Sequence, residues 1–345
     1  MNKLTLIQPD DWHLHVRHGA ILNTVIAHTA KQFGRAIIMP NLNPPIITVD
    51  QALEYREEII NALPESSSFS PLMTLYLSNT LTPEEIKKAA ASEHIHAIKL
   101  YPAGATTNSD SGVSDLKAIY PLLKTMEAVD LPLLIHGEVT NQDCDIFDRE
   151  KEFVSSSLSD IVKNFPNLRI VVEHVTTKEA VDFVLSASDK VAATITPQHL
   201  LFNRNAILAG GIRPHHYCLP IIKREHHRLA LVKAATSGNP KFFLGTDSAP
   251  HLTGAKESSC GCAGCYSAYG AMELYTEVFE QENALDKLEG FASIYGADFY
   301  QLPRNTQTIT LEKKNWTVPA TYKVDNSTIT PLKANDILSW KQQII

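Results

Sequence analysis

The stretch DWHLHVR, residues Asp11–Arg17, shows the pattern that decides the fold of this chain. Apolar and polar residues alternate with a period of two, which predicts a β-strand over Trp12–Val16. On such a strand His13, His15 and Arg17 point to one side, and the apolar side chains point to the other. Two imidazoles on one side of a strand can share a metal ion. The stretch therefore predicts a strand with a candidate metal site at its end.

Seven more short apolar runs follow, with amphipathic helical stretches between them. The eight predicted strands are Trp12–Val16, Ala36–Met39, Leu72–Leu77, Ala97–Leu100, Leu133–Ile135, Ile170–Glu173, Ala192–Ile195 and Phe242–Leu244. This alternation predicts an α/β fold with a parallel sheet, and eight strands favour a (β/α)8 TIM barrel of about 250 residues. We predict a single domain over residues 1–345, with a C-terminal extension from about residue 306 that holds short β-like pieces.

Two helix starts are marked by local signals. Thr82-Pro83-Glu84-Glu85 places an N-cap, a proline at the first helical position and a capping-box acid in order. Thr176 with Glu179 has the spacing of a second capping box. Further helices are predicted near Tyr269–Gln281 and Leu285–Tyr295.

Polar residues follow most of the predicted strands. Besides His13 and His15 they are Asn41, Lys99, His136, Glu173, His174 and Asp247. In a barrel the carboxyl ends of all strands surround one mouth, so these side chains should converge there. The four histidines with Lys99 and Asp247 offer enough ligands for two divalent cations, and nitrogen and carboxylate donors suit zinc. We predict a binuclear metal site at the C-terminal face of the strands.

Lys99 is the unusual member of this set, because dications repel an ammonium. The lysine should therefore be neutral, and burial readily lowers a lysine pKa. A neutral amine can take up carbon dioxide and become a carbamate, whose two oxygens can bridge two metal ions.

Each of these residues also has a simpler explanation. An HxH pair arises by chance, and His136 and His174 taken singly could be hydrogen-bonded core histidines. Lys99 could extend its ammonium to solvent, and Asp247 could cap a loop. All of these explanations would have to hold together, at the strand ends of one barrel. The metal centre is the favoured interpretation.

Charge and composition exclude several other classes of protein. The net charge is −7 and 44% of the residues are hydrophobic, which suits a globular protein and not a nucleic-acid binder. The sequence contains no apolar run of membrane-spanning length and no signal-peptide core at its N-terminus. Five cysteines, an odd number, indicate reduced thiols. We expect a cytoplasmic protein that acts on a small molecule.

The run CGCAGC, residues 260–265, suggests a zinc ribbon at first sight. It contains only three thiols, whereas structural zinc sites have four ligands. We favour a tight glycine-rich loop whose backbone binds substrate. The pairs His215-His216 and His226-His227 lie in polar stretches, and we assign them no role.

Several longer strings carry a family resemblance. They are DWHLHVR, MPNLNPP, AIKLYPAGATTNSDSGV, LIHGEV, VVEHVT and FFLGTDSAPH. With them the chain resembles the amidohydrolase superfamily and, within it, the dihydroorotases of the bacterial homodimeric class. The HxH pair indicates only a metal hydrolase, whereas the strings around Asn41, Lys99 and His251 are much more specific.

The resemblance implies a role for each candidate residue. His13, His15 and Asp247 would hold one zinc ion, His136 and His174 would hold the other, and carboxylated Lys99 would bridge the two. Substrate would be bound by Arg17, Asn41, His136 and His251, and by backbone groups near Leu219 and Ala263. Thr106 and Thr107 would lie on a loop that closes over substrate. Asp247 would also be the catalytic acid and base.

The implied activity is the interconversion of N-carbamoyl-L-aspartate and (S)-dihydroorotate in pyrimidine biosynthesis, in a homodimer. Two alternatives remain at this point. One is another cyclic-amide hydrolase, such as a hydantoinase or an allantoinase. The other is a non-catalytic homologue that serves as a binding module. Arg17, Asn41 and His251 favour an anionic substrate, and the complete ligand set favours an enzyme.

The segment 103–112 has the composition of a mobile loop. It consists of small and polar residues, contains two glycines and follows Lys99 closely. We expect it to be mobile without substrate and to close with the Thr106 and Thr107 hydroxyls over a bound carboxylate. The alternative is an ordinary solvated connector.

Overall fold

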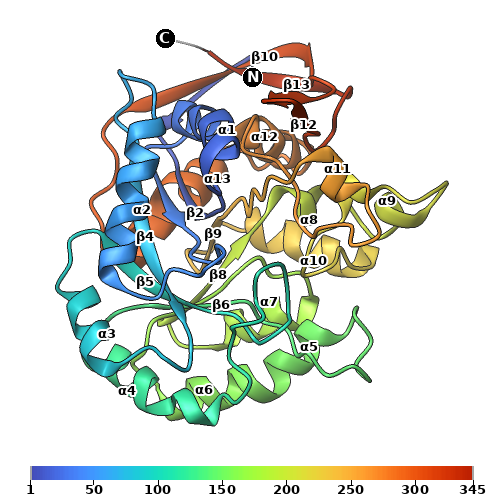
Figure 1. The fold of residues 1–345 in the computed structure, drawn as a ribbon. Coiled ribbons are helices and arrows are strands. Elements are labelled where there is room, and N and C mark those ends of the chain that lie inside the picture. The colour runs from blue at the N-terminus through green and yellow to red at the C-terminus, as the bar shows by residue number, and fades with distance from the viewer. Residues whose placement is uncertain (1, 344–345) are drawn as a thin grey trace.

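The computed structural model describes residues 2–343, and these form the predicted barrel (Figure 1). Eight parallel strands are neighbours in sequence order, from β2 to β9. They are β2 (Asp10–Leu14), β3 (Arg35–Ile38), β4 (Ser70–Leu77), β5 (Ile95–Leu100), β6 (Leu133–Ile135), β7 (Ile170–Val172), β8 (Val191–Ile195) and β9 (Phe242–Leu244). The isolated parallel bridge between Leu14 and Ser248 joins the two ends of the sheet. The prediction of a (β/α)8 barrel is confirmed.

Helices surround the strands on the outside of the barrel (Figure 1). In chain order they are α1 (Gly19–Gln32), α2 (Val49–Ala62), α3 (Pro83–Ala90), α4 (Tyr120–Ala128), α5 (Arg149–Phe153), α6 (Ser159–Asn164), α7 (Lys178–Ser186), α8 (Pro197–Leu201), α9 (Asn205–Leu208), α10 (Glu225–Ala235), α11 (Thr253–Lys256), α12 (Ala271–Gln281), α13 (Leu285–Glu289) and α14 (Tyr295–Phe299). Within the described residues, no helix has the length and apolar character needed to cross a membrane.

Packed side chains fill the barrel interior and close its amino-terminal end. Trp12 lies inside with one apolar residue from each of the other strands, and Tyr300 stacks on its ring at 4.6 Å between centroids. Gly296 permits this close approach, because a Cβ there would lie 2.0 Å from the Trp12 indole nitrogen. Since this end of the barrel is filled, a site that opens into the barrel is expected at the carboxyl ends of the strands.

The first barrel strand lies two residues earlier than predicted. It covers Asp10–Leu14, because the Asp11 carboxylate accepts hydrogen bonds from the backbone of His13 and Thr246 and so holds the strand within the sheet. His15 and Arg17 consequently follow the strand instead of lying on it. The prediction of strand residues through Val16 was wrong, although His13 and His15 still come together.

The C-terminal extension is an antiparallel sheet that also includes the N-terminus. β10 (Thr308–Thr317) pairs with β13 (Ile337–Gln342) and with β1 (Lys3–Ile7), a strand that the sequence analysis missed. β11 (Tyr322–Val324) and β12 (Ser327–Ile329) form a separate hairpin. The β1, β10 and β13 strands lie together beside α1 and α12 (Figure 1).

One of the two predicted helix starts is confirmed, and the other lies one residue away from its predicted position. Thr82 caps α3 by accepting from the Glu85 backbone at 3.2 Å, as predicted. The cap of α7 is Thr177 and not Thr176, because the Glu150 carboxylate accepts from the Thr176 backbone N–H. The second capping-box prediction was therefore wrong by one residue.

Candidate active site

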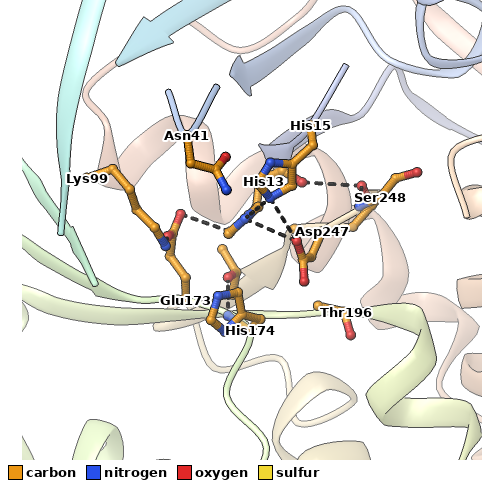
Figure 2. A network of polar contacts seen from close by, with 12 residues as sticks. His13, His15, Asn41, Lys99, Glu173, His174, Thr196, Asp247 and Ser248 are labelled. Atoms are coloured by element: carbon orange, nitrogen blue, oxygen red, sulfur yellow. Dashed lines mark hydrogen bonds and ion pairs between the residues drawn. The ribbon is translucent and has the colours of Figure 1, made fainter. Parts of the chain in front are cut away.

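The polar residues at the strand ends converge in one buried pocket. The cavity itself is small, about 20 Å³, and its lining includes most of the residues singled out from the sequence. The lining residues are His13, His15, Arg17, Asn41, Tyr101, Thr106, Thr107, His136, His174, Leu219, Asp247, Ala249, Ala263 and Gly264. Figure 2 shows the centre of this group, with the side chains from different strands pointing toward one another.

His13, His15 and Asp247 form the tightest group. The Asp247 Oδ1 atom lies 3.3 Å from His13 Nε2 and 3.2 Å from His15 Nε2. The two Nε2 atoms are 3.3 Å apart. All three residues are buried, and their three donor atoms can meet at one cation. These are the three residues expected to hold one metal ion.

Burial sets the charge of these groups. It lowers the pKa of His15 to about 3 and also lowers the pKa of His13, so both rings are neutral at pH 7 and can offer a lone pair. Burial alone would raise the pKa of Asp247, but its contacts with the two histidines outweigh that effect and hold the pKa well below the usual range. Asp247 is therefore a carboxylate. Two neutral imidazoles and one carboxylate suit a zinc ion.

His136 and His174 lie beside this group. The His174 ring is 4.8 Å from the His136 ring and 5.0 Å from the His13 ring, measured between centroids. The Nε2 atom of His136 forms a 2.8 Å hydrogen bond with Glu138, so its Nδ1 atom is left for another partner. The buried Nδ1 atom of His174 has no hydrogen-bond partner. Free ring nitrogens on two adjacent buried histidines fit a second cation.

Lys99 is fully buried between the histidines and the ring of Tyr101. Its Nζ atom lies 4.6 Å from the centroid of that ring and contacts the Glu173 carboxylate. Burial lowers the pKa of Lys99 well below its usual value. The amine is thus readily available in its neutral form, as the carbamate interpretation requires.

Glu173 and Glu138 are the functional candidates that sequence reasoning did not assign. Glu173 contacts Lys99, and its Oε1 atom lies 3.0 Å from His13 Nδ1. Together with His13 and His174 it makes a second possible metal-binding group, which differs from the expected set. We favour His136 over Glu173 as a ligand, because Glu173 already contacts Lys99 and His13. The sequence did offer a signal for both residues: Glu173 directly precedes His174, and Glu138 follows His136 by two residues.

Three pocket residues hold a left-handed backbone conformation that is unusual for residues with side chains. They are Arg17 (φ 62°), His174 (φ 43°) and Asp247 (φ 44°). Hydrogen bonds hold each of these residues. The Tyr55 hydroxyl donates to the Arg17 carbonyl at 2.7 Å. The backbone N–H of His174 donates to the Thr194 hydroxyl at 2.8 Å, and that of Asp247 donates to the His13 carbonyl at 2.9 Å. Such strain costs about 1–3 kcal/mol per residue and is typical of functional sites.

The residues expected to bind a carboxylate lie on one side of the pocket. Arg17 Nη2 is 3.2 Å from His251 Nε2, and His251 Nε2 is 3.0 Å from the carbonyl oxygen of Ala263. Arg17 Nε donates to the Pro250 carbonyl at 3.3 Å. The arginine is therefore held in place beside His251, and Leu219 lies among the lining residues with it.

The loop 103–112 covers this side of the pocket and is held more firmly than its composition suggested. Asn41 donates to the Thr107 carbonyl at 3.1 Å, and Asn108 donates back to the Asn41 carbonyl at 3.1 Å. The Thr107 hydroxyl donates to the Ala263 carbonyl at 3.4 Å. Thr106 and Thr107 both line the pocket.

The cysteine-rich loop contributes Ala263 and Gly264 to the pocket, and its three cysteines form no disulfide within residues 2–343. Ala263 and Gly264 line the pocket, whereas the two groups of possible metal ligands found in residues 2–343 contain no cysteine. The structure therefore gives no support to a zinc ribbon in this loop.

Comparisons with known proteins agree with this geometry. The model of the amidohydrolase family matches residues 4–332. A dihydroorotase from Synechocystis sp. is 61% identical over 341 residues, covering 99% of both chains. The crystal structure of dihydroorotase from Saccharomyces cerevisiae in complex with 5-fluoroorotic acid has a TM-score of 0.91 and 37% identity, with 99% of both chains covered. The dihydroorotase structure from Campylobacter jejuni has a TM-score of 0.92 and 35% identity, with 99% of this chain and 98% of that chain covered.

Proposed function

Because the chain belongs to the dihydroorotases of the amidohydrolase family, we propose that its barrel pocket holds two zinc ions and converts dihydroorotate. The protein is a hydrolase that acts on a cyclic amide, and the reaction interconverts N-carbamoyl-L-aspartate and (S)-dihydroorotate. The observation that carries the two-metal proposal is the convergence of four neutral histidines and a carboxylate in one pocket, with a buried lysine against the lining residue Tyr101.

The proposed metal ligands fall into two sets joined by Lys99. His13, His15 and Asp247 would hold one zinc ion, and His136 and His174 would hold the other. The neutral Lys99 amine would add to carbon dioxide and release a proton, which gives a carbamate with two oxygens, one for each ion. Bound there, the metal ions would acidify a water molecule and polarise the carbonyl of the scissile amide.

Arg17, Asn41 and His251 would orient the substrate carboxylate. A guanidinium meets a carboxylate through two parallel hydrogen bonds, which fixes direction as well as charge. Because Pro250 and His251 already hold the Arg17 side chain, little freedom is lost on binding. Backbone groups of Leu219 and Ala263 would complete the contact surface, with His136 beside the scissile amide.

Asp247 is the proposed proton carrier. In ring opening it would accept a proton from the attacking water and deliver it to the departing ring nitrogen. In ring closure it would remove a proton from the urea nitrogen. Its low pKa keeps it deprotonated, the form in which a carboxylate can accept a proton, and its contacts with His13 and His15 support a place for it beside the proposed metal ions.

Ring opening of three substrates tests this function. The purified, zinc-loaded protein is incubated with dihydroorotate, hydantoin and allantoin, and the product of each is measured. We expect conversion of dihydroorotate alone, because Arg17 and His251 select an anion. Turnover of hydantoin or allantoin in preference would support the rival cyclic-amide hydrolases, and no turnover with metal bound would support the binding module.

Glu138 is expected to control metal affinity. Its hydrogen bond to His136 Nε2 would hold the ring with Nδ1 free for the second cation, and outer carboxylates of this kind typically contribute about 10–100-fold in metal affinity. We therefore expect Glu138→Ala to bind the zinc ion assigned to His136 and His174 about 10–100-fold less tightly, measured by chelator competition.

A matched control for Glu138 is Glu273→Gln. Glu273 is also buried, with one oxygen that accepts a hydrogen bond and one without a partner, but it lies in α12 and bonds to the Gln342 backbone. It should leave zinc affinity unchanged. Equal zinc affinity in wild type and Glu138→Ala would remove Glu138 from the metal centre.

The loop residues Thr106 and Thr107 are proposed to close over substrate and donate to its carboxylate. The double variant Thr106→Ala/Thr107→Ala should keep its zinc and lose about tenfold or more in kcat/KM, because a hydrogen bond to a charged group contributes about 1.5–3 kcal/mol. Steady-state kinetics and metal analysis measure both quantities. Thr5→Ala/Thr310→Ala, an interacting pair in the antiparallel sheet, is the control. Unchanged kinetics in the loop variant would show the loop to be a connector.

We also propose that the chain is one domain, because β1 near the N-terminus pairs with β10 of the C-terminal extension. A homodimer in the cytoplasm follows from the family resemblance. Light scattering of the purified protein tests the dimer, which a monomer mass at micromolar concentration would exclude.

A further inference from the structure

Lys256, at the end of α11, is a buried cation with no acidic partner. It is 3% exposed, and none of the ion pairs formed within residues 2–343 includes it. Its Nζ atom instead donates to three backbone carbonyls, those of Tyr217 at 2.8 Å, Cys262 at 2.7 Å and Gly264 at 2.9 Å. Burying an unpaired charge is costly, so a position that keeps one needs an explanation.

The three carbonyls belong to two segments that are distant in sequence and adjacent at the pocket. Tyr217 stands two residues before Leu219, and Cys262 and Gly264 flank Ala263. Leu219 and Ala263 both line the pocket. The ammonium therefore joins the two segments that contribute Leu219 and Ala263 to the pocket lining.

The two segments also contact each other directly, at the same Tyr217 carbonyl to which Lys256 donates. The Gly264 backbone N–H also donates to the Tyr217 carbonyl at 3.0 Å. A Cβ at Gly264 would lie 2.8 Å from Ala249, so the loop cannot move inward. On the other side, His199 Nε2 lies 2.9 Å from the Pro220 carbonyl oxygen.

Ala263 also contacts two other residues that are proposed to bind substrate, His251 and Thr107. The Ala263 carbonyl oxygen lies 3.0 Å from His251 Nε2 and accepts a hydrogen bond from the Thr107 hydroxyl at 3.4 Å. A shift of the cysteine-rich loop would therefore move His251 and the covering loop as well. Within residues 2–343, none of the hydrogen bonds that Lys256 donates goes to a proposed metal ligand.

We infer that Lys256 is a positioning residue for substrate: its ammonium sets the distance between the Leu219 and Ala263 segments, and thereby the shape of the surface that receives dihydroorotate. This inference rests on the proposed function. Lys256 acts through backbone carbonyls and does not itself touch substrate. Its loss should impair substrate binding while metal binding stays intact, which separates it from the proposed ligands.

The first test is Lys256→Met in the full-length, zinc-loaded protein, because methionine has a similar length and no N–H donor. We expect KM for dihydroorotate to rise at least tenfold, kcat to change less than KM, and zinc content to equal that of wild type. A rise in KM with kcat retained reports lost substrate binding. If Lys256→Met does not fold, Lys256→Gln, which keeps two N–H donors, takes its place with a smaller expected rise.

The second test is chemical rescue of Lys256→Ala. Methylammonium offers N–H donors to the three carbonyls, whereas tetramethylammonium has the same charge and none. At equal ionic strength we expect only methylammonium to lower KM toward the wild-type value. The matched control is Lys241→Met, because Lys241 also donates to two backbone carbonyls, those of Val184 and Ala187, but at the other end of the barrel.

The outcomes distinguish a failure of the proposed function from a failure of the inference about Lys256. A wild-type protein without dihydroorotate turnover would overturn the proposed function. Wild-type turnover together with an unchanged KM in Lys256→Met would overturn the inference alone. So would equal rescue by both ammonium ions, or the same rise of KM in Lys241→Met.

Discussion

Replacing Lys99 with alanine is expected to abolish most of the turnover and to lower the zinc content. The side chain is fully buried among the proposed ligands, and its carbamate would supply an oxygen to each of the two ions. Without it the second ion would keep only His136 and His174 from the chain. Two imidazoles are fewer than the three protein ligands usual in catalytic zinc sites. Metal analysis after dialysis and the dihydroorotate assay measure the two losses.

Rescue distinguishes a missing bridge from general damage. A short carboxylic acid such as acetate or propionate fits the space that alanine leaves and carries two oxygens, so it should restore part of both metal content and turnover. Lys99→Arg is the matched variant, because a guanidinium stays charged and cannot form a carbamate. It should be inactive with or without the acid. Normal turnover and two zinc ions in Lys99→Ala without additive would show the carbamate proposal to be wrong.

The barrel was predictable because its signal is repeated. Each predicted strand is a short apolar run and most have a polar residue at or near their end, so an error at one strand does not change the class of fold. The error at the first strand shows this: the strand ends at Leu14 instead of Val16, yet His13 and His15 still meet. β1 was missed because its partner, β10, is about 300 residues away, and a strand that pairs at such a distance carries no local signal of its partner.

The proposed ligands could be named from the sequence, but their supporting residues could not. A candidate metal ligand can be identified in the sequence by its residue type and by its place at a strand end. Glu138, Glu173 and Lys256 differ from surface residues only by what surrounds them, and burial at that level depends on the packing of several segments. The backbone angles of Arg17, His174 and Asp247 are also invisible in the sequence, because non-glycine residues adopt them only when tertiary contacts compensate for the strain.

Asp247→Asn is expected to lose about 10²–10⁴-fold in kcat, because general acid and base catalysis contributes about that much and an amide cannot carry the proton. Substrate binding should change little, since Arg17 and His251 are untouched and the side chain keeps its shape. The variant also retains one carbonyl oxygen that can still face His13 and His15. The loss should therefore fall on kcat and not on KM.

Metal content decides how this result is interpreted, because Asp247 is both a proposed ligand and the proposed proton carrier. Zinc must be measured in the same preparation, and kcat compared at equal occupancy. If Asp247→Asn at full occupancy is still slowed about a hundredfold or more, the loss belongs to proton transfer. If its kcat recovers to near the wild-type value once zinc is restored, Asp247 serves only as a ligand. His251, which lies 3.2 Å from Arg17 Nη2, would then be the next candidate for the proton carrier.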